Sequence, residues 1–239
     1  MPLTSYSVDE NGVALLRLER EKARNAINTE MLEEVLVHLS AAKEDETVHV
    51  LVISSNDHLG LSAGADVREE LDAEARVHRM ELFARLYDEL TSFPKPTVAA
   101  CHGSVVGAGA EIAVACDLRV GGSNLRMRFP GAELGVPVGP ARLAPLVGEA
   151  LAKDLIFTSR VLGAAEAERV GFVRSVHPAE GAEAAALALA EELATRPVAG
   201  LRRMKRLFLE LGDGPARVEH ENEELVDFQR HGTGLPRRG

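Results

Sequence analysis

The sequence predicts an α/β fold in which strands and helices alternate through the first part of the chain and helices fill the rest. Two observations indicate this. Short apolar runs, turns and amphipathic segments follow one another up to residue 129, whereas from Glu149 onward the apolar residues recur at helical spacing. Strand-turn-helix units followed by helices are typical of an α/β core with a helical C-terminal part.

The first part of the chain predicts four strands and three helices. Apolar, β-branched runs indicate the strands, and in the last of them Leu125, Met127 and Phe129 alternate with arginines, as in a half-buried strand. Thr29 can cap the first helix, and Pro94 and Pro96 end the second. The expected strands are residues 13–18, 48–54, 97–101 and 125–129, and the expected helices start at Thr29, include residues 80–90 and cover about 108–116.

Four further helices are expected in the second part of the chain. The apolar positions in residues 149–157 and 164–170 have helical spacing, an alanine-rich run covers 182–194, and another amphipathic run covers 198–211. No low-complexity linker marks an internal boundary. We therefore expect a core over residues 1–195 and a C-terminal helical region over 196–239.

Composition limits the classes of partner. The chain has 239 residues, 46% of them apolar, which is enough to bury a full core. Its 37 acidic and 27 basic residues give a net charge of -10, which argues against nucleic acid and anionic membranes as partners. Cys101 and Cys116 stand among apolar neighbours and are expected to be buried free thiols. Free thiols and an N-terminus without the apolar core of a signal peptide together predict a cytoplasmic protein.

Two glycine-rich stretches carry the chemistry. They read Leu61-Ser-Ala-Gly-Ala-Asp66 and His102-Gly-Ser-Val-Val-Gly-Ala-Gly-Ala-Glu111. Small residues let a substrate carbonyl reach main-chain amides, and each such donor in an oxyanion hole contributes roughly 3 kcal/mol to the transition state. The second stretch does not match a dinucleotide-binding fingerprint, because Ile112 stands where the third glycine should be. A serine hydrolase is not expected, because the sequence contains no Gly-x-Ser-x-Gly turn to supply the nucleophile. For either stretch alone, close packing of strand against helix explains the glycines equally well.

Together the two stretches resemble the signatures of the crotonase (enoyl-CoA hydratase/isomerase) superfamily. The resemblance implies a spiral of ββα turns with a helical C-terminal trimerisation region, and a homotrimer or dimer of trimers. It implies an acyl-CoA thioester as substrate and partner, with no other cofactor and no metal. It assigns the amides of the oxyanion hole to Ala65 and Ala108, the second at a helix N-terminus that favours an anion.

Glu111 is the candidate proton-handling residue. It lies one helical turn beyond Ala108 and matches one of the two catalytic glutamates of the hydratases. Its apolar neighbours predict a buried carboxyl group with a raised pKa. The second glutamate is missing, because Gly131 occupies its place, and Glu133 is displaced by two residues, too far to replace it without rearrangement.

The resemblance also implies the residues that hold the coenzyme. Main-chain contacts are expected around Ala26 and residues 63–67, and Arg24 is expected to help balance the CoA phosphates. Lys205 matches a lysine that reaches a neighbouring subunit's coenzyme. The expected substrate-binding set is Arg24, Ala26, Ala63, Gly64, Asp66, Val67, Gly107, Gly131 and Lys205.

Enoyl-CoA hydration is the first expectation for the reaction, because Glu111 is the glutamate of the hydratase type. Decarboxylation of a malonyl-type thioester and double-bond isomerisation are the alternatives within the family. From a different class, a non-catalytic homologue that binds CoA esters would also lack the second glutamate. After residue 227 the sequence departs from the family's usual C-terminus, which leaves one wall of the pocket undefined.

Overall fold

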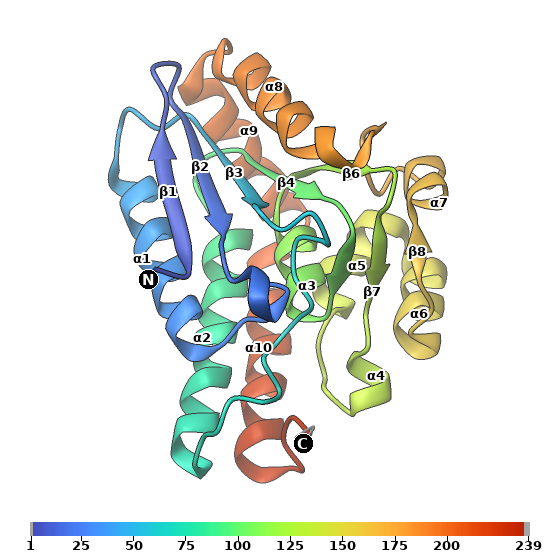
Figure 1. Cartoon of the computed structure of the whole chain (residues 1–239). Helices are drawn as coiled ribbons and strands as arrows, with labels where there is room; N and C mark the ends of the chain where they lie inside the picture. Colours follow the sequence, from blue (N-terminus) through green and yellow to red (C-terminus); the bar gives the residue numbers. More distant parts are fainter. Residues whose placement is uncertain (1, 237–239) are drawn as a thin grey trace.

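Residues 2–236 are described in a computed structural model, and they form two β-sheets and a set of surrounding helices (Figure 1). The larger sheet has six strands in the order β1-β2-β3-β4-β6-β9, of which only β1 runs antiparallel to its neighbour. The smaller sheet has the order β5-β7-β8. The strands are β1 (Thr4–Val8), β2 (Val13–Leu18), β3 (Val50–Ser55), β4 (Thr97–Cys101), β5 (Ser104–Val106), β6 (Leu118–Gly122), β7 (Arg126–Arg128), β8 (Leu162–Gly163) and β9 (Val176–His177).

The helices cover both faces of the larger sheet. Leu16 on β2 and Ile53 on β3 pack toward α1, α2 and α3, whereas Leu15 and Val52 point to the opposite face, where α8 covers them (Figure 1). The helices are α1 (Thr29–Glu44), α2 (Ala73–Thr91), α3 (Ala108–Ala115), α4 (Gly131–Leu134), α5 (Pro140–Val147), α6 (Glu149–Thr158), α7 (Ala164–Arg169), α8 (Ala182–Ala194), α9 (Val198–Leu211) and α10 (Gly214–His231), with 3-10 turns η1 (Glu21–Ala23) and η2 (Ala179–Gly181).

The structure confirms the predicted fold class and corrects some of its details. All the predicted helices are present, and α8 and α9 have the predicted bounds. The cap of α1 is Asn28 and not Thr29, because the Asn28 side chain accepts a hydrogen bond from the amide of Met31 at 3.2 Å. The helices α4, α5 and α10 and the strands β1, β5, β6, β8 and β9 were not predicted. Residues 1 and 237–239 of the two predicted regions lie outside the described residues.

No helix in residues 2–236 is long and apolar enough to cross a membrane.

A close contact between two loops organises the functional end of the sheet. The connection from β3 to α2 runs down the front of the molecule in Figure 1 and pairs with the segment that follows β4, through bridges Gly60↔Gly103 and Ser62↔Val105. A Cβ atom on Gly103 would lie 2.2 Å from the carbonyl oxygen of Leu59, and Gly103 has a φ of 52°. Only glycine fits there, and the contact brings the two glycine-rich stretches together.

We expect Gly103→Ala to destabilise the protein by about 2 kcal/mol or more, because the methyl group meets backbone atoms that cannot rotate away and φ is positive. The matched control is Gly163→Ala, since a Cβ on Gly163 would meet no atom within 4 Å and its φ is -87°. The control should change the free energy of unfolding by less than about 0.5 kcal/mol. Urea denaturation measures both, and equal stability of the two variants would contradict the expectation.

Candidate active site

Two backbone amides are free to bind one oxygen atom. In the parallel bridge between Ile27 and Ala65, the amide of Ile27 donates to Gly64 O at 2.8 Å, and the amide of Asp66 donates to Ile27 O at 2.8 Å. The amide of Ala65 therefore points the other way, as alternation along an extended chain requires. Ala108 is the first residue of α3, and its amide has no partner within the helix.

These amides lie on adjoining segments. A Cβ atom on Gly64 would lie 3.7 Å from the amide nitrogen of Ala108, and one on Gly107 would lie 3.9 Å from the Cα of Gly64. Gly109 lets α3 pack closely against the first glycine-rich stretch, because a Cβ on Gly109 would come within 2.6 Å of the Cβ of Ser62. The packing thus places both amides at the mouth of one cavity.

The cavity has a volume of about 200 Å³ and walls that are mainly apolar. Leu225 of α10, together with Leu235 and Pro236, forms the wall that the sequence left undefined. Leu235 is held by a hydrogen bond of 3.1 Å from its amide to Gln229 Oε1. Seven residues of the predicted site line this cavity: Ala63, Gly64, Ala65, Val67, Gly107, Ala108 and Gly131.

Position 131 has no room for a side chain. A Cβ on Gly131 would lie 2.9 Å from Val136 O and 3.2 Å from Val138 O. Residues 136–138 therefore close over the position at which the hydratases carry their second glutamate. Glu133 lines the cavity from α4, but its carboxylate is paired with Arg128, which lines the cavity as well.

Glu111 lies behind the wall of the cavity. Its side chain is 2% exposed, and its Oε2 accepts hydrogen bonds from Arg142 Nη2 at 3.0 Å and Nε at 3.2 Å. Its Oε1 faces Gly139, where a Cβ would come within 3.1 Å. Gly139 adjoins Val138, which lines the cavity, whereas Glu111 itself is not among the lining residues.

A second carboxylate completes this buried cluster. Arg142 Nη2 also donates to Glu221 Oε1 at 2.6 Å, and Glu221 Oε2 accepts from the amide of Ala141 at 2.7 Å. The guanidinium carbon of Arg142 lies 4.5 Å from the centre of the Tyr87 ring. No sequence motif marks Arg142 or Glu221, and only the apolar neighbours of Arg142 could have indicated its burial.

The environment of Glu111 raises the pKa of its carboxyl group. Burial is the main cause and raises the pKa of Glu111 to about 7, while Arg142 acts to lower it and Glu221 to raise it. A carboxyl group with this pKa can both accept and return a proton at physiological pH. The structure thus places two backbone amides beside one cavity and a buried carboxyl group with a raised pKa behind it.

Comparison with known proteins identifies the family. The sequence profile described as Enoyl-CoA hydratase/isomerase matches residues 9–228. The chain is 34% identical over 197 residues to the 2,3-dehydroadipyl-CoA hydratase of Escherichia coli K12, a match that covers 81% of this chain and 77% of the relative. The chain belongs to the enoyl-CoA hydratase/isomerase family. The crotonyl-CoA hydratase of Syntrophomonas wolfei is also 34% identical, over 70% of this chain and 66% of that protein.

Solved structures of the family share the fold. The enoyl-CoA hydratase of Bacillus anthracis superposes with a TM-score of 0.81 at 26% identity, covering 94% of this chain and 91% of that one. The family's CoA thioester chemistry requires a route for the coenzyme to the cavity. Of the predicted contacts, Ala26 and Asp66 adjoin the Ile27–Ala65 bridge, and Arg24 directly follows η1.

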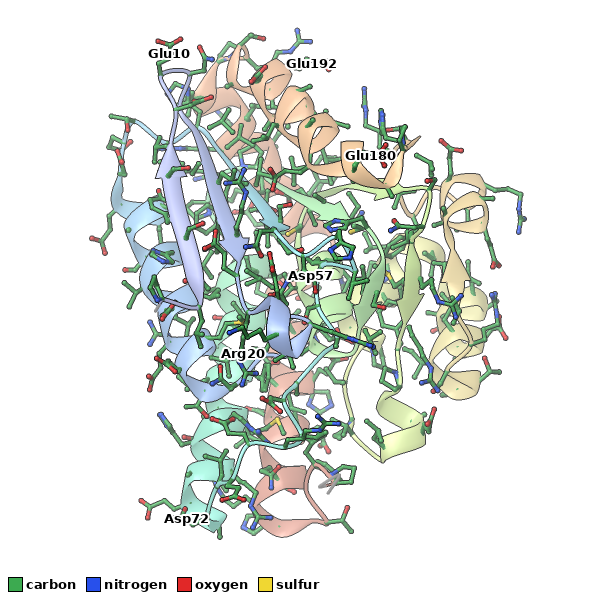
Figure 2. The ribbon with its side chains drawn as sticks, in the orientation of Figure 1. Glu10, Arg20, Asp57, Asp72, Glu180 and Glu192 are labelled. Carbon is green, nitrogen blue, oxygen red and sulfur yellow. The ribbon has the colours of Figure 1, made fainter. Side chains whose placement is uncertain are left out.

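The residues around η1 lie beside the first glycine-rich stretch. Arg20, labelled in Figure 2, donates to Ala26 O at 2.8 Å and pairs with Asp66 at 2.6 Å, which ties η1 to the first glycine-rich stretch. Arg24 ends η1 with a left-handed φ of 52°. The guanidinium of Arg20 is thus already bound to groups of this chain, whereas Arg24 has no ion pair among the described residues.

Lys205 lies elsewhere. It is buried on α9, where its Nζ donates to Lys95 O at 3.0 Å and to Asp117 at 2.8 Å. It is not among the residues that line the cavity described above. Its predicted contact with a neighbouring subunit's coenzyme remains a prediction.

We expect the stability of the protein to depend on the ionisation of Glu111. Because its pKa is raised in the folded state, its protonation stabilises the fold fully below its ordinary pKa of 4.5, and this stabilisation is lost as the pH rises through about 7. Between pH 5 and pH 8 the free energy of unfolding of the parent should therefore fall relative to that of Glu111→Gln, by on the order of 3 kcal/mol. Urea denaturation at both pH values tests this, and a constant difference between the two proteins would contradict it.

Proposed function

We propose that the protein is an enoyl-CoA hydratase that works with a single catalytic glutamate. One combination of features carries the proposal. The amides of Ala65 and Ala108 are without partners beside the cavity, and behind it lies the buried carboxyl group of Glu111, with a pKa of about 7. Relatives with about one third identity are hydratases by name, including those that act on crotonyl-CoA and 2,3-dehydroadipyl-CoA.

In the proposed reaction the thioester carbonyl lies between the amides of Ala65 and Ala108. Ionised Glu111 takes a proton from water as the water oxygen bonds to the β-carbon, and the electron pair of the double bond moves onto the carbonyl oxygen. The resulting enolate is stabilised by the two amides. Glu111 then returns its proton to the α-carbon, so that one carboxyl group serves both steps and the net change is addition of water.

Decarboxylation of a malonyl-type thioester is a second candidate, and the closed position at Gly131 favours it. Loss of carbon dioxide leaves its bonding electrons on the same enolate, without any base to start the reaction. Protonated Glu111 would then deliver the proton to carbon. Isomerisation and ligand binding without turnover are the remaining alternatives, and neither has a specific feature of the cavity in its favour.

We expect purified protein to consume crotonyl-CoA, measured as the loss of its enone absorbance, and Glu111→Gln to lower kcat by about 100-fold or more. Glu224→Gln is the matched control, because Glu224 is exposed on α10 and makes no ion pair among the described residues. Binding of crotonyl-CoA by Glu111→Gln, measured by calorimetry, separates loss of chemistry from loss of binding.

The outcomes distinguish the candidates. Full turnover by Glu111→Gln would refute the single-glutamate mechanism. Binding of crotonyl-CoA without turnover by the parent would exclude hydration of this substrate, and malonyl-CoA would then test decarboxylation. If the parent binds CoA thioesters but converts none of them, the non-catalytic alternative is favoured.

We also propose that the chain assembles as a homotrimer or a dimer of trimers in the cytoplasm. The support comes from α9, where Met204, Phe208 and Leu211 are 59%, 80% and 86% exposed. Apolar side chains exposed together on one helix are typical of a surface that another protein covers.

We expect the double change Phe208→Asp and Leu211→Asp to dissociate the assembly, because it would place two charges in the covered surface. Sedimentation equilibrium of the parent and the variant measures the change in mass. A monomeric parent would refute the proposed assembly. An assembled variant with the same mass as the parent would instead refute the role of the α9 surface in that assembly.

A further inference from the structure

Glu111, Arg142 and Glu221 form a buried ionic cluster drawn from three distant parts of the chain. They come from α3, α5 and α10, and their side chains are 2%, 2% and 9% exposed. Three charged side chains at this depth are costly to bury, and hydrophobic residues of similar volume often give equal or greater stability. The cluster therefore calls for an explanation besides stability.

The geometry of the contact between Arg142 and Glu111 is selective. An arginine fork commonly binds both oxygens of a carboxylate. Here Nε and Nη2 both donate to Oε2, at 3.2 and 3.0 Å, while Oε1 faces Gly139. The two hydrogen bonds hold the carboxyl group in one orientation and occupy only one of its oxygens.

Glu221 holds the arginine in that position. It accepts from Arg142 Nη2 through one oxygen and from the amide of Ala141 through the other, so it is fixed to both the side chain and the backbone of the start of α5. The guanidinium of Arg142 also lies over the face of the Tyr87 ring of α2. Movement of Arg142 away from Glu111 would break these contacts as well.

We propose that Arg142, anchored by Glu221, is the positioning residue of Glu111, and that it holds Oε2 so that Oε1 is the oxygen that exchanges protons with water and substrate. The inference rests on the proposed function only for that exchange. The contact itself stands on the distances above.

The charges of the cluster give the anchor a second effect. The ionisable groups that face Glu111 are Arg142 of α5, Glu221 of α10 and Tyr87 of α2. Burial keeps the pKa of the Tyr87 phenol above its ordinary value, so it stays neutral at physiological pH. One guanidinium therefore faces two carboxylates, and the negative charge of Glu221 favours the proton on Glu111. Helix α10 thus influences the ionisation of a residue on α3.

The test is the titration of Glu111, followed by the carbon-13 chemical shift of glutamate side-chain carboxyl groups and assigned by its loss in Glu111→Gln. Glu221→Gln keeps the size and a hydrogen-bond acceptor but removes the charge. It should lower the midpoint of Glu111 by about one pH unit or more, and the inflection of kcat against pH should follow. Glu224→Gln, on the same helix but exposed, should leave both unchanged.

Arg142→Lys tests the positioning role. Lysine keeps the charge but cannot make the two-pronged contact, so kcat should fall by about 10-fold or more while KM for crotonyl-CoA changes by less than about twofold. Glu221→Gln decides the charge effect independently if Arg142→Lys does not fold.

Two results would overturn the inference. An unchanged midpoint of Glu111 in Glu221→Gln would show that the cluster is only structural, and an unchanged kcat in folded Arg142→Lys would refute the positioning role. Full hydration by Glu111→Gln would instead refute the proposed function and the proton exchange at Oε1. The titration would still decide whether Glu221 sets the ionisation of Glu111, so the two failures can be told apart.

Discussion

Backbone-to-backbone packing between the two glycine-rich stretches is the contact on which the site depends. Gly60 lies against Gly103, Gly64 against Val106, and Gly109 against Ser62. At each of these places a side chain would push the two segments apart. The amides of Ala65 and Ala108 could then no longer donate hydrogen bonds to the same oxygen atom. The sheet and its helices provide the rigid support, but the absence of side chains sets the spacing of the donors.

The buried cluster gives this rigid support a chemical role. The amides of the hole are neutral and do not depend on pH, whereas the carboxyl group behind the cavity titrates near neutrality because it is buried beside both an opposite and a like charge. In the proposed reaction, stabilisation of the enolate and transfer of the proton are therefore controlled by separate parts of the fold. The first depends on two loops, and the second on the packing of α3, α5 and α10.

The sequence predicted what local pattern determines. Helical spacing located most of the helices, although it misplaced the cap of α1. The glycine-rich stretches indicated Ala65 and Ala108, which line the cavity, and Glu111 behind it. The role of Arg142 could not be predicted, because Glu221 lies 79 residues further along the chain and only the tertiary fold brings the two together. The same holds for α10, whose charged sequence conceals the few residues, among them Val218 and Leu225, that it buries.

The closed position at Gly131 also restricts how this site can change over evolutionary time. A glutamate there would meet the carbonyl oxygens of Val136 and Val138, and these belong to the backbone, so no change of rotamer can make room. A second carboxylate at position 131 would need a new course for residues 136–138 together with the substitution, because the substitution alone disturbs packing. Two interdependent changes are therefore required before this position can carry a carboxyl group.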